Sequence, residues 1–186
     1  MAGARYELIA VAARGFRPPQ FLSTDPVGDD TEADGAPGTG SDGEGGGDHP
    51  GLRSVWRLLY RRIAETGPPE TVPYGIYLLG VDPPEGLTDD DLEVFNRFYT
   101  DVHLPEVAER RQALRASRYE LVREDRAPYR GAPRYLAVYE VDERSASNRR
   151  HTGPKYSAGP EVWQRHTTPW RLWYRRLPAA GATPTP

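Results

Sequence analysis

Residues 87–105 constrain the fold more than any other stretch, because they predict one amphipathic helix with a defined beginning. Thr88 is a favourable N-cap residue, and Asp91 stands three positions later, where a capping box places its acid. Aspartates at 89–91 lie in the first turn, where negative charge stabilises the positive end of the helix dipole. The apolar stripe that follows helical spacing consists of Leu92, Phe95, Tyr99 and Val102. The rest of the chain must therefore supply a surface for this stripe to cover.

The end of this helix carries polar side chains beside the apolar stripe. Asn96, Tyr99 and His103 are spaced so that they lie on the flank of the same helical face. Pro105 disfavours helical geometry at the residue before it, so the helix is expected to end or kink just after His103. A polar helical segment is expected to follow over 106–116. An imidazole at a helix end, next to an apolar face, is a candidate acid or base.

The composition excludes several kinds of site and partner. The 186 residues include no cysteine, which excludes disulfides and cysteine-based metal or thiol chemistry. No apolar run approaches the ~18 residues that a membrane-spanning helix needs. The first residues lack the charged-then-apolar order of a signal peptide, so a cytoplasmic protein with no membrane partner is expected. No basic cluster stands out, and nucleic acid is therefore not an expected partner.

Residues 18–50 are predicted to be a disordered linker. They are rich in Gly, Asp, Thr and Pro, and residues 21–50 hold eight acidic residues and no Lys or Arg. Such a composition buries too little apolar surface to offset the entropy of ordering. The glycine-rich run is not predicted to bind phosphate, because it has no lysine and no flanking strand and helix.

Two short sequence matches predict an internal repeat. Residues 56–63 (Trp-Arg-Leu-Leu-Tyr-Arg-Arg-Ile) agree with residues 170–177 (Trp-Arg-Leu-Trp-Tyr-Arg-Arg-Leu) at six of eight positions. Residues 5–8 (Arg-Tyr-Glu-Leu) recur, in the same order along the chain, as residues 118–121. The copy at 170–177 alternates as a strand does, so both copies are predicted to be strands. Residues 1–71 are therefore predicted to be a degenerate partial repeat whose two strands pack on the remainder.

Residues 72–178 are predicted to form the main domain, followed by a flexible tail at 179–186. Strands are expected over 74–81, 117–124, 134–141 and 168–177, with helices at 87–105 and in short pieces at 143–150 and 161–166. This β-α-β-β-α-β order is that of a ferredoxin-like α+β sandwich. Helices on one face of the sheet leave an aromatic-rich face in need of cover, and a second sheet would complete an α/β barrel. That second sheet comes either from this chain or from the other subunit of a homodimer.

Three stretches resemble the EthD-like branch of the dimeric α/β-barrel superfamily. Residues 95–105 (Phe-Asn-Arg-Phe-Tyr-Thr-Asp-Val-His-Leu-Pro) resemble the family's Asn-x-Trp-Tyr-x-x-x-His-x-Pro helix. Residues 117–119 (Ser-Arg-Tyr) resemble its Ala-x-Arg-Tyr strand, and residues 133–140 (Pro-Arg-Tyr-Leu-Ala-Val-Tyr-Glu) resemble its Pro-x-Tyr-Leu-Ala-x-Tyr-Glu strand. The resemblance covers about 105 residues and departs at Phe98, where the family usually has Trp.

The resemblance implies a cofactor-independent enzyme with an apolar cavity between sheet and helices, and with no metal. Cyclisation, isomerisation or dehydration of a small, apolar, oxygenated molecule is expected, polyketide-like or aromatic, in bacterial specialised metabolism. His103 is the expected general acid or base, Tyr99 the donor to an oxyanion, and Asn96 the residue that orients either of them. The residues expected to line the cavity and bind substrate are Tyr74, Tyr77, Tyr139, Trp163, His166, Trp170 and Trp173. A homodimer is the expected assembly.

Other interpretations of the same residues stay open. The chain is alternatively a cofactor-free monooxygenase of anthrone-type substrates, or a non-catalytic binding or assembly protein. A histidine at a helix end is also typical of a capping group bonded to carbonyls of its own last turn. The aromatic residues equally suit a core or a dimer interface. The helix C-terminus favours the charged form of His103 and burial opposes it, so its protonation state is open.

Overall fold

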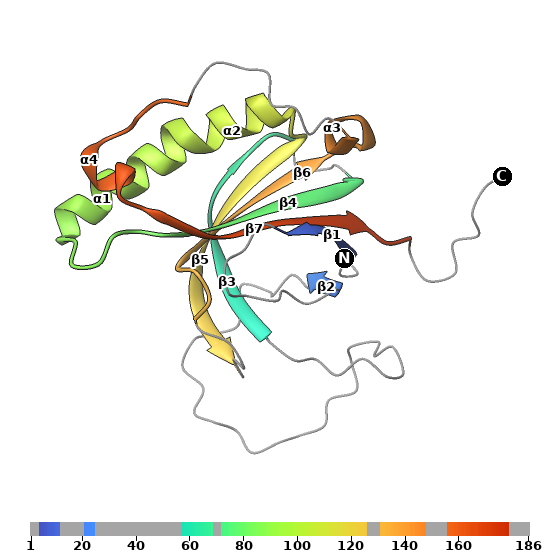
Figure 1. Cartoon of the computed structure of the whole chain (residues 1–186), viewed down its shortest axis with the longest axis horizontal. Coiled ribbons are helices and arrows are strands. Elements are labelled where there is room, and N and C mark those ends of the chain that lie inside the picture. The colour runs from blue at the N-terminus through green and yellow to red at the C-terminus, as the bar shows by residue number, and fades with distance from the viewer. Residues whose placement is uncertain are drawn as a thin grey trace.

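The computed structural model describes residues 4–11, 21–24, 57–68, 72–125, 131–147 and 156–178. They form an α+β structure in which helices lie along one face of an antiparallel sheet (Figure 1). The α+β class predicted from the sequence is confirmed. Within these described residues, no helix is long and apolar enough to cross a membrane.

The described part of the sheet has seven strands in the order β2-β1-β7-β4-β6-β5-β3, and every neighbouring pair is antiparallel. The strands are β1 (Ala4–Val11), β2 (Phe21–Thr24), β3 (Arg57–Thr66), β4 (Gly75–Asp82), β5 (Arg115–Asp125), β6 (Tyr135–Val141) and β7 (Thr167–Arg176). The adjacent strands β7-β4-β6-β5 follow an order that is compatible with a ferredoxin-like fold.

Strand β2 corrects one sequence-based prediction. It pairs antiparallel with β1, so the prediction of a disordered linker over 18–50 is wrong for residues 21–24. Its sequence, Phe-Leu-Ser-Thr, precedes the acidic run and lacks the charge that defines the rest of the stretch. The other residues of the predicted linker, and the predicted tail at 179–186, lie outside the described residues.

The helical layer consists mainly of one long rod built from three segments. These are α1 (Asp89–Phe98), a π-helical segment η1 (Tyr99–His103) and α2 (Leu104–Arg111). The short helices α3 (Glu143–Ser147) and α4 (Glu161–Gln164) complete the layer, and α4 lies beside α1 (Figure 1). Helix α1 begins as predicted, since the Asp91 amide donates to the Thr88 hydroxyl oxygen at 3.2 Å. The Thr88 hydroxyl in turn donates to the Asp91 carboxylate at 3.0 Å.

The prediction that the helix ends or kinks after His103 was only partly right. Pro105 has no N–H and its ring collides with the carbonyl four residues earlier in an α-helix. The chain accommodates it by widening one turn: the Leu104 amide donates to the Tyr99 carbonyl, five residues back, and the helix then continues. The continuation is shorter than the predicted 106–116, because Gln112 adopts a left-handed conformation (φ 52°) and β5 starts three residues later.

Two apolar layers lie on opposite faces of the sheet. Alternate residues of β6 separate them: Tyr135, Ala137 and Tyr139 pack under the helices, whereas Leu136 and Val138 pack on the other face. The buried members of the helix-facing layer are Tyr77, Leu79, Val81, Phe95, Tyr99, Leu104, Val107, Ala116, Tyr135, Ala137, Tyr139, Val162 and Trp163. The buried members of the opposite layer are Ile76, Leu78, Trp170, Leu172 and Tyr174. Every residue from 75 to 81 in β4 is buried, as expected for a central strand.

The repeated sequences pair in equivalent ways. Strands β1 and β5 hold the two Arg-Tyr-Glu-Leu copies, and β3 and β7 hold the two Trp-Arg-Leu copies from their second residue on. In β3·β5, Arg61 lies opposite Glu120. In β1·β7, the equivalent residues Arg175 and Glu7 lie opposite each other.

One irregularity is equivalent in these two pairings. The register of β3·β5 passes from Tyr60↔Leu121 to Leu59↔Arg123, so Val122 has no opposite residue. The register of β1·β7 passes from Leu8↔Tyr174 to Ala10↔Trp173 and skips the position that corresponds to Val122. The two strand pairs therefore share this register and this bulge, whereas a second register shift, between Arg62 and Ala64, is present in β3·β5 alone of the two.

Candidate functional site

The π-helical segment places Tyr99 and His103 at its two ends. Tyr99 is fully buried, and its hydroxyl has no hydrogen-bond partner among the described residues. Burial raises the pKa of the Tyr99 hydroxyl, which therefore stays protonated and able to donate. The ring of His103 lies 5.7 Å from the Tyr99 ring, centroid to centroid. The two side chains predicted as donor and acid or base are thus neighbours.

His103 is held in an aromatic environment that disfavours its charged form. Its ring centroid lies 4.6 Å from that of Trp163 and 5.3 Å from that of Tyr156. Burial, followed by the nearby His166, lowers the pKa of His103 from 6.5 to about 4. The imidazole is therefore neutral at pH 7, which answers the question that the sequence left open. Its Nδ1 is buried and has no hydrogen-bond partner in the described part of the chain.

Helix α4 covers this histidine through Trp163. Trp163 also packs on Phe98 at 5.4 Å, and the ring of His166 stacks on it at 4.1 Å. His166 is fixed by its Nδ1, which donates to the Trp163 carbonyl at 2.6 Å. Gly159 permits the close approach of this segment, since a Cβ there would lie 2.6 Å from both the Phe98 and Trp163 side chains.

Two further polar side chains reach the same layer from α2 and β6. The guanidinium carbon of Arg111 lies 3.6 Å from the centre of the Tyr77 ring, and its Nε and Nη1 have no hydrogen-bond partner among the described residues. The Tyr139 hydroxyl is likewise buried without such a partner, and burial raises its pKa. The Tyr139 ring lies 6.1 Å from that of Tyr77. We call Tyr99, His103, Arg111 and Tyr139 the inner polar cluster.

Arg111 was not predicted from the sequence, although a signal for it exists. Tyr99, His103, Val107 and Arg111 follow one another at intervals of four residues, which places them along one side of a continuous helix. That pattern has meaning only if the helix continues past Pro105. Because an end or kink was expected at that point, residues beyond it were not connected to the site.

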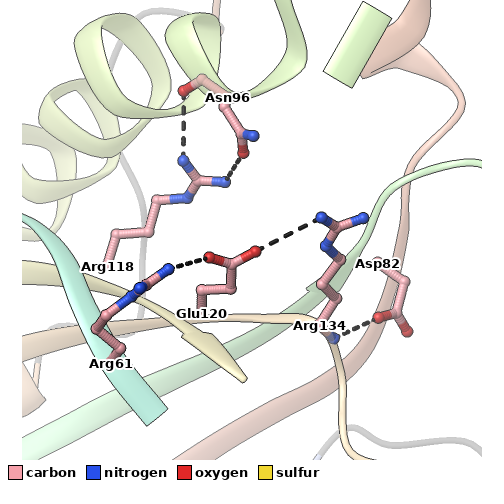
Figure 2. Close-up of polar contacts among 6 residues, drawn as sticks. All are labelled: Arg61, Asp82, Asn96, Arg118, Glu120 and Arg134. Atoms are coloured by element: carbon pink, nitrogen blue, oxygen red, sulfur yellow. Dashed lines mark hydrogen bonds and ion pairs between the residues drawn. The ribbon is translucent and has the colours of Figure 1, made fainter. Parts of the chain in front are cut away.

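Asn96 does not join the inner polar cluster, contrary to its predicted role of orienting Tyr99 or His103. Its side-chain oxygen accepts a hydrogen bond from Arg118 Nη2 at 2.6 Å, and its backbone carbonyl accepts one from Arg118 Nη1 at 3.3 Å. Figure 2 shows the Arg118 guanidinium directed at Asn96 on the helix, with Glu120 between Arg61 and Arg134 on the sheet.

The remaining predicted site residues are divided between the two faces. Trp163 and Tyr77 are buried in the helix-facing layer, and Trp173 packs against that layer and stacks on Tyr77 at 4.5 Å. Trp170 lies in the opposite layer, so the structure does not bring it to the inner polar cluster. Tyr74 is half-buried just before β4.

Two shallow hollows lie on the described surface, and His103 lines neither. The larger, of about 430 Å³, is lined by Ile63, Glu93, Asn96, Arg97, Thr100, Asp101, Arg118, Glu120 and Tyr135. The smaller, of about 290 Å³, is lined by Val94, Arg97, Phe98, Asp101, Val102 and Pro160. The larger hollow therefore lies over Asn96 and the buried Arg118, and away from the predicted imidazole.

Comparison with protein-family models, with curated proteins and with solved structures found no match for this chain. In the part of the chain that the structure describes, no three His, Cys, Asp or Glu side chains gather where they would hold a metal ion.

Proposed function

We propose that the protein is a cofactor-independent enzyme that moves a proton on a small oxygenated molecule bound between α2 and the sheet. The supporting observation is the inner polar cluster: four buried or half-buried side chains whose polar atoms lack partners in the described structure. Buried polar groups without partners cost free energy, and they are tolerated where a ligand or water satisfies them. The resemblance of residues 95–105 to the EthD-like helix supports the same assignment.

His103 has the properties of a base that returns its proton. The neutral imidazole at pH 7 accepts a proton through its unpartnered Nδ1. Burial disfavours the resulting imidazolium, so the proton is passed back readily. Removal of a proton from the carbon next to a carbonyl leaves the electron pair on the carbonyl oxygen as an enolate. Return of the proton to a different carbon gives isomerisation, and its transfer to a departing hydroxyl gives dehydration with release of water.

The other members of the inner polar cluster can stabilise the negative charge on the enolate oxygen. The Tyr99 and Tyr139 hydroxyls stay protonated because burial raises both pKa values, so each can donate a hydrogen bond. Arg111 supplies a positive charge, although burial lowers its pKa relative to a free guanidinium. The surrounding aromatic rings favour an apolar, aromatic or polyketide-like body for the substrate.

Hydrogen–deuterium exchange of a model ketone tests this proposal. With benzoylacetone in D2O, the protein should accelerate deuterium incorporation at the carbon between the carbonyls. His103→Gln should slow that acceleration by about 100-fold or more, the size of a general-base contribution. Tyr139→Phe should slow it less, and Glu109→Gln, an exposed position on α2, should not change it.

Two results would overturn the catalytic assignment. Equal exchange rates for His103→Gln and the unaltered protein would remove the proposed base. Saturable binding of benzoylacetone with no accelerated exchange would favour the non-catalytic binding protein. Oxygen consumption with anthrone would instead favour the monooxygenase alternative.

We also propose that β1 and β3 are the remains of a preceding repeat and that they take, within one chain, the place of a second subunit's strands. The supporting observation is the shared register and bulge of β1·β7 and β5·β3. A two-fold rotation that maps β1 onto β5 and β7 onto β3 would relate the two strand pairs. Two copies of one unit pair in this way across an isologous interface. In this arrangement β1 and β3 occupy the positions that a second subunit's strands would fill.

A monomer is the expected result in solution, in contrast to the homodimer expected from the sequence resemblance. Light scattering after size exclusion should give a mass near 20.8 kDa at micromolar concentrations. A stable species of twice that mass would support closure across a homodimer. Arg61→Pro, in the middle of β3, should disrupt the β3·β5 ladder and promote association through the freed edge of β5.

A further inference from the structure

Residues 156–166, which we call the strap, lie over the π-helical segment. The strap contains α4, leads into β7 and runs along the long helical rod from α2 towards α1 (Figure 1). Among the described aromatic rings, its Trp163 is the nearest to both Tyr99 and His103, with centroids 4.9 and 4.6 Å away. Its Tyr156 ring is the next nearest to His103, at 5.3 Å. The strap therefore covers the proposed donor and the proposed base.

The strap is hydrogen-bonded to the rest of the described structure at one carboxylate. The Ser157 amide donates to the two Glu106 oxygens at 3.3 and 3.2 Å, and the Ser157 hydroxyl donates to the same group. Every other hydrogen bond of the strap within the described residues joins two of its own residues. Because the contacts with Glu106 are exposed, water can replace them. The strap can therefore separate as a unit without leaving buried backbone groups unpaired.

Side-chain packing holds the strap down, and the sheet anchors one of its ends. Val162 and Trp163 are 8 % and 4 % exposed and belong to the helix-facing layer. Thr167, the residue after the strap, pairs with Asp82 of β4. Towards the other end, the strap is bonded to Glu106 instead of to a strand. A peripheral segment with few bonds to its surroundings opens at a lower free energy than the core does.

The proposed reacting groups are closed off in this arrangement. The Tyr99 hydroxyl and His103 Nδ1 are buried, and neither residue lines either of the two hollows. A substrate that contacts these atoms has to displace a covering segment. The sheet and the rod are held by ladder and helix hydrogen bonds, whereas the strap is held by packing and by one exposed carboxylate. The strap is therefore the covering segment whose movement breaks the fewest hydrogen bonds.

We propose that the strap is a lid that opens at its Glu106 end, about its anchor at β7, and admits substrate to Tyr99 and His103. Withdrawal of Trp163 uncovers both rings, because it is the nearest ring to each of them. Closure over a bound molecule excludes water from the proton transfer. The role in substrate entry rests on the function proposed above, whereas the opening itself rests on the packing and hydrogen bonds of the strap.

Thiol labelling tests the opening, since the chain has no cysteine of its own. Val162→Cys places a thiol beneath the closed strap, and Val107→Cys places one on the buried side of α2, at a position 2 % exposed. With excess N-ethylmaleimide, the thiol at 162 should react at least about tenfold faster than the thiol at 107. Its rate should also depend less on urea, because local opening exposes less surface than global unfolding. Equal rates with equal urea dependence would overturn the proposal.

Two changes should speed the labelling of Val162→Cys. Glu106→Ala removes the acceptor that holds the strap, so the rate should rise about three- to tenfold, whereas Glu109→Ala, exposed on the same helix, should not change it. Gly159→Ala should also raise the rate, because its Cβ would overlap the side chains beneath the strap. Gly86→Ala is its control, since Gly86 has the same φ of 74° and nothing within 4 Å of an added Cβ. Unchanged rates in both Glu106→Ala and Gly159→Ala would contradict the lid.

A covalent closure tests the role in substrate entry. Glu106→Cys and Ser157→Cys, joined by a short bismaleimide, fix the strap to α2, and the same double variant capped with N-ethylmaleimide is the control. The joined form should exchange benzoylacetone at least about tenfold more slowly than the capped form. Equal catalysis by both forms would overturn the role in entry. Labelling that shows opening, in a protein that catalyses no exchange in any form, would support the lid and remove the proposed function.

Discussion

The free energy of unfolding is expected to fall by about 3 kcal/mol between pH 7 and pH 4 because of His103 alone. Its pKa is lowered from 6.5 to about 4 in the folded protein, so between these values the unfolded chain binds the proton and the folded chain does not. The stability that neutral His103 contributes is therefore complete above pH 6.5 and is lost as the pH falls toward 4. Urea unfolding at a series of pH values measures this slope.

His103→Gln separates this contribution from those of other groups. The variant should be less sensitive to pH between 6.5 and 4, because it has no proton to take up at this position. His166, whose pKa burial also lowers, keeps a smaller dependence of the same sign in the variant. Parallel stability curves for the variant and the unaltered protein would show that His103 titrates normally, and would contradict its burial against Trp163.

Replacement of Arg118 by Met is expected to lower the free energy of unfolding by about 3 kcal/mol. The change leaves the partly buried acceptors of Asn96 and Thr100 without their donor, and an unsatisfied buried group costs about 1–3 kcal/mol. It also removes a cation stacked between Tyr99 and Tyr135. Chemical denaturation measures the loss.

Two other variants distinguish this local effect from a general loss of charge. Arg165→Met, at an exposed position just after α4, should change stability by less than about 0.5 kcal/mol. Asn96→Asp should equal or exceed the stability of the unaltered protein, since it gives Arg118 an opposite charge. A loss as large in Arg165→Met as in Arg118→Met would contradict the special role of the Arg118 hydrogen bonds.

The π-helical turn explains why the helix was predicted correctly up to Pro105 and not beyond it. The capping pattern and apolar spacing depend on residues close in sequence, and both were read correctly for α1. How a helix accommodates a proline depends on whether tertiary packing maintains the rod. Here Leu104 and Val107 are buried against the sheet, so continuing the helix retains apolar contacts that a break would lose. Arg111 reaches the inner polar cluster for that reason.

The hydrogen bond between Asn96 and Arg118 could not be predicted from the sequence either, because it joins a helix to a strand. Their spacing of 22 residues carries no information about contact, and Arg118 was noted only as part of a repeated tetrapeptide. The contact arises because the Arg118 side chain extends from β5 to Asn96 in α1 and Thr100 in η1. In a similar way, Arg97 pairs with Glu93 on its own helix, a choice that sequence spacing permits but does not select.

The amino-acid sequence by itself determined the α+β class, the order of strands and helices along residues 72–178, the start of the long helix and the likeness between the two repeated segments. These features depend on local spacing, capping and composition, which need no knowledge of distant residues. Only the tertiary structure decided the charge state of His103, the placement of Arg111 and Tyr139 around Tyr77, and the burial of Arg118 against Tyr99 and Tyr135. Each of those depends on burial and on which side chains meet across the sheet, and burial is a property of the packed chain.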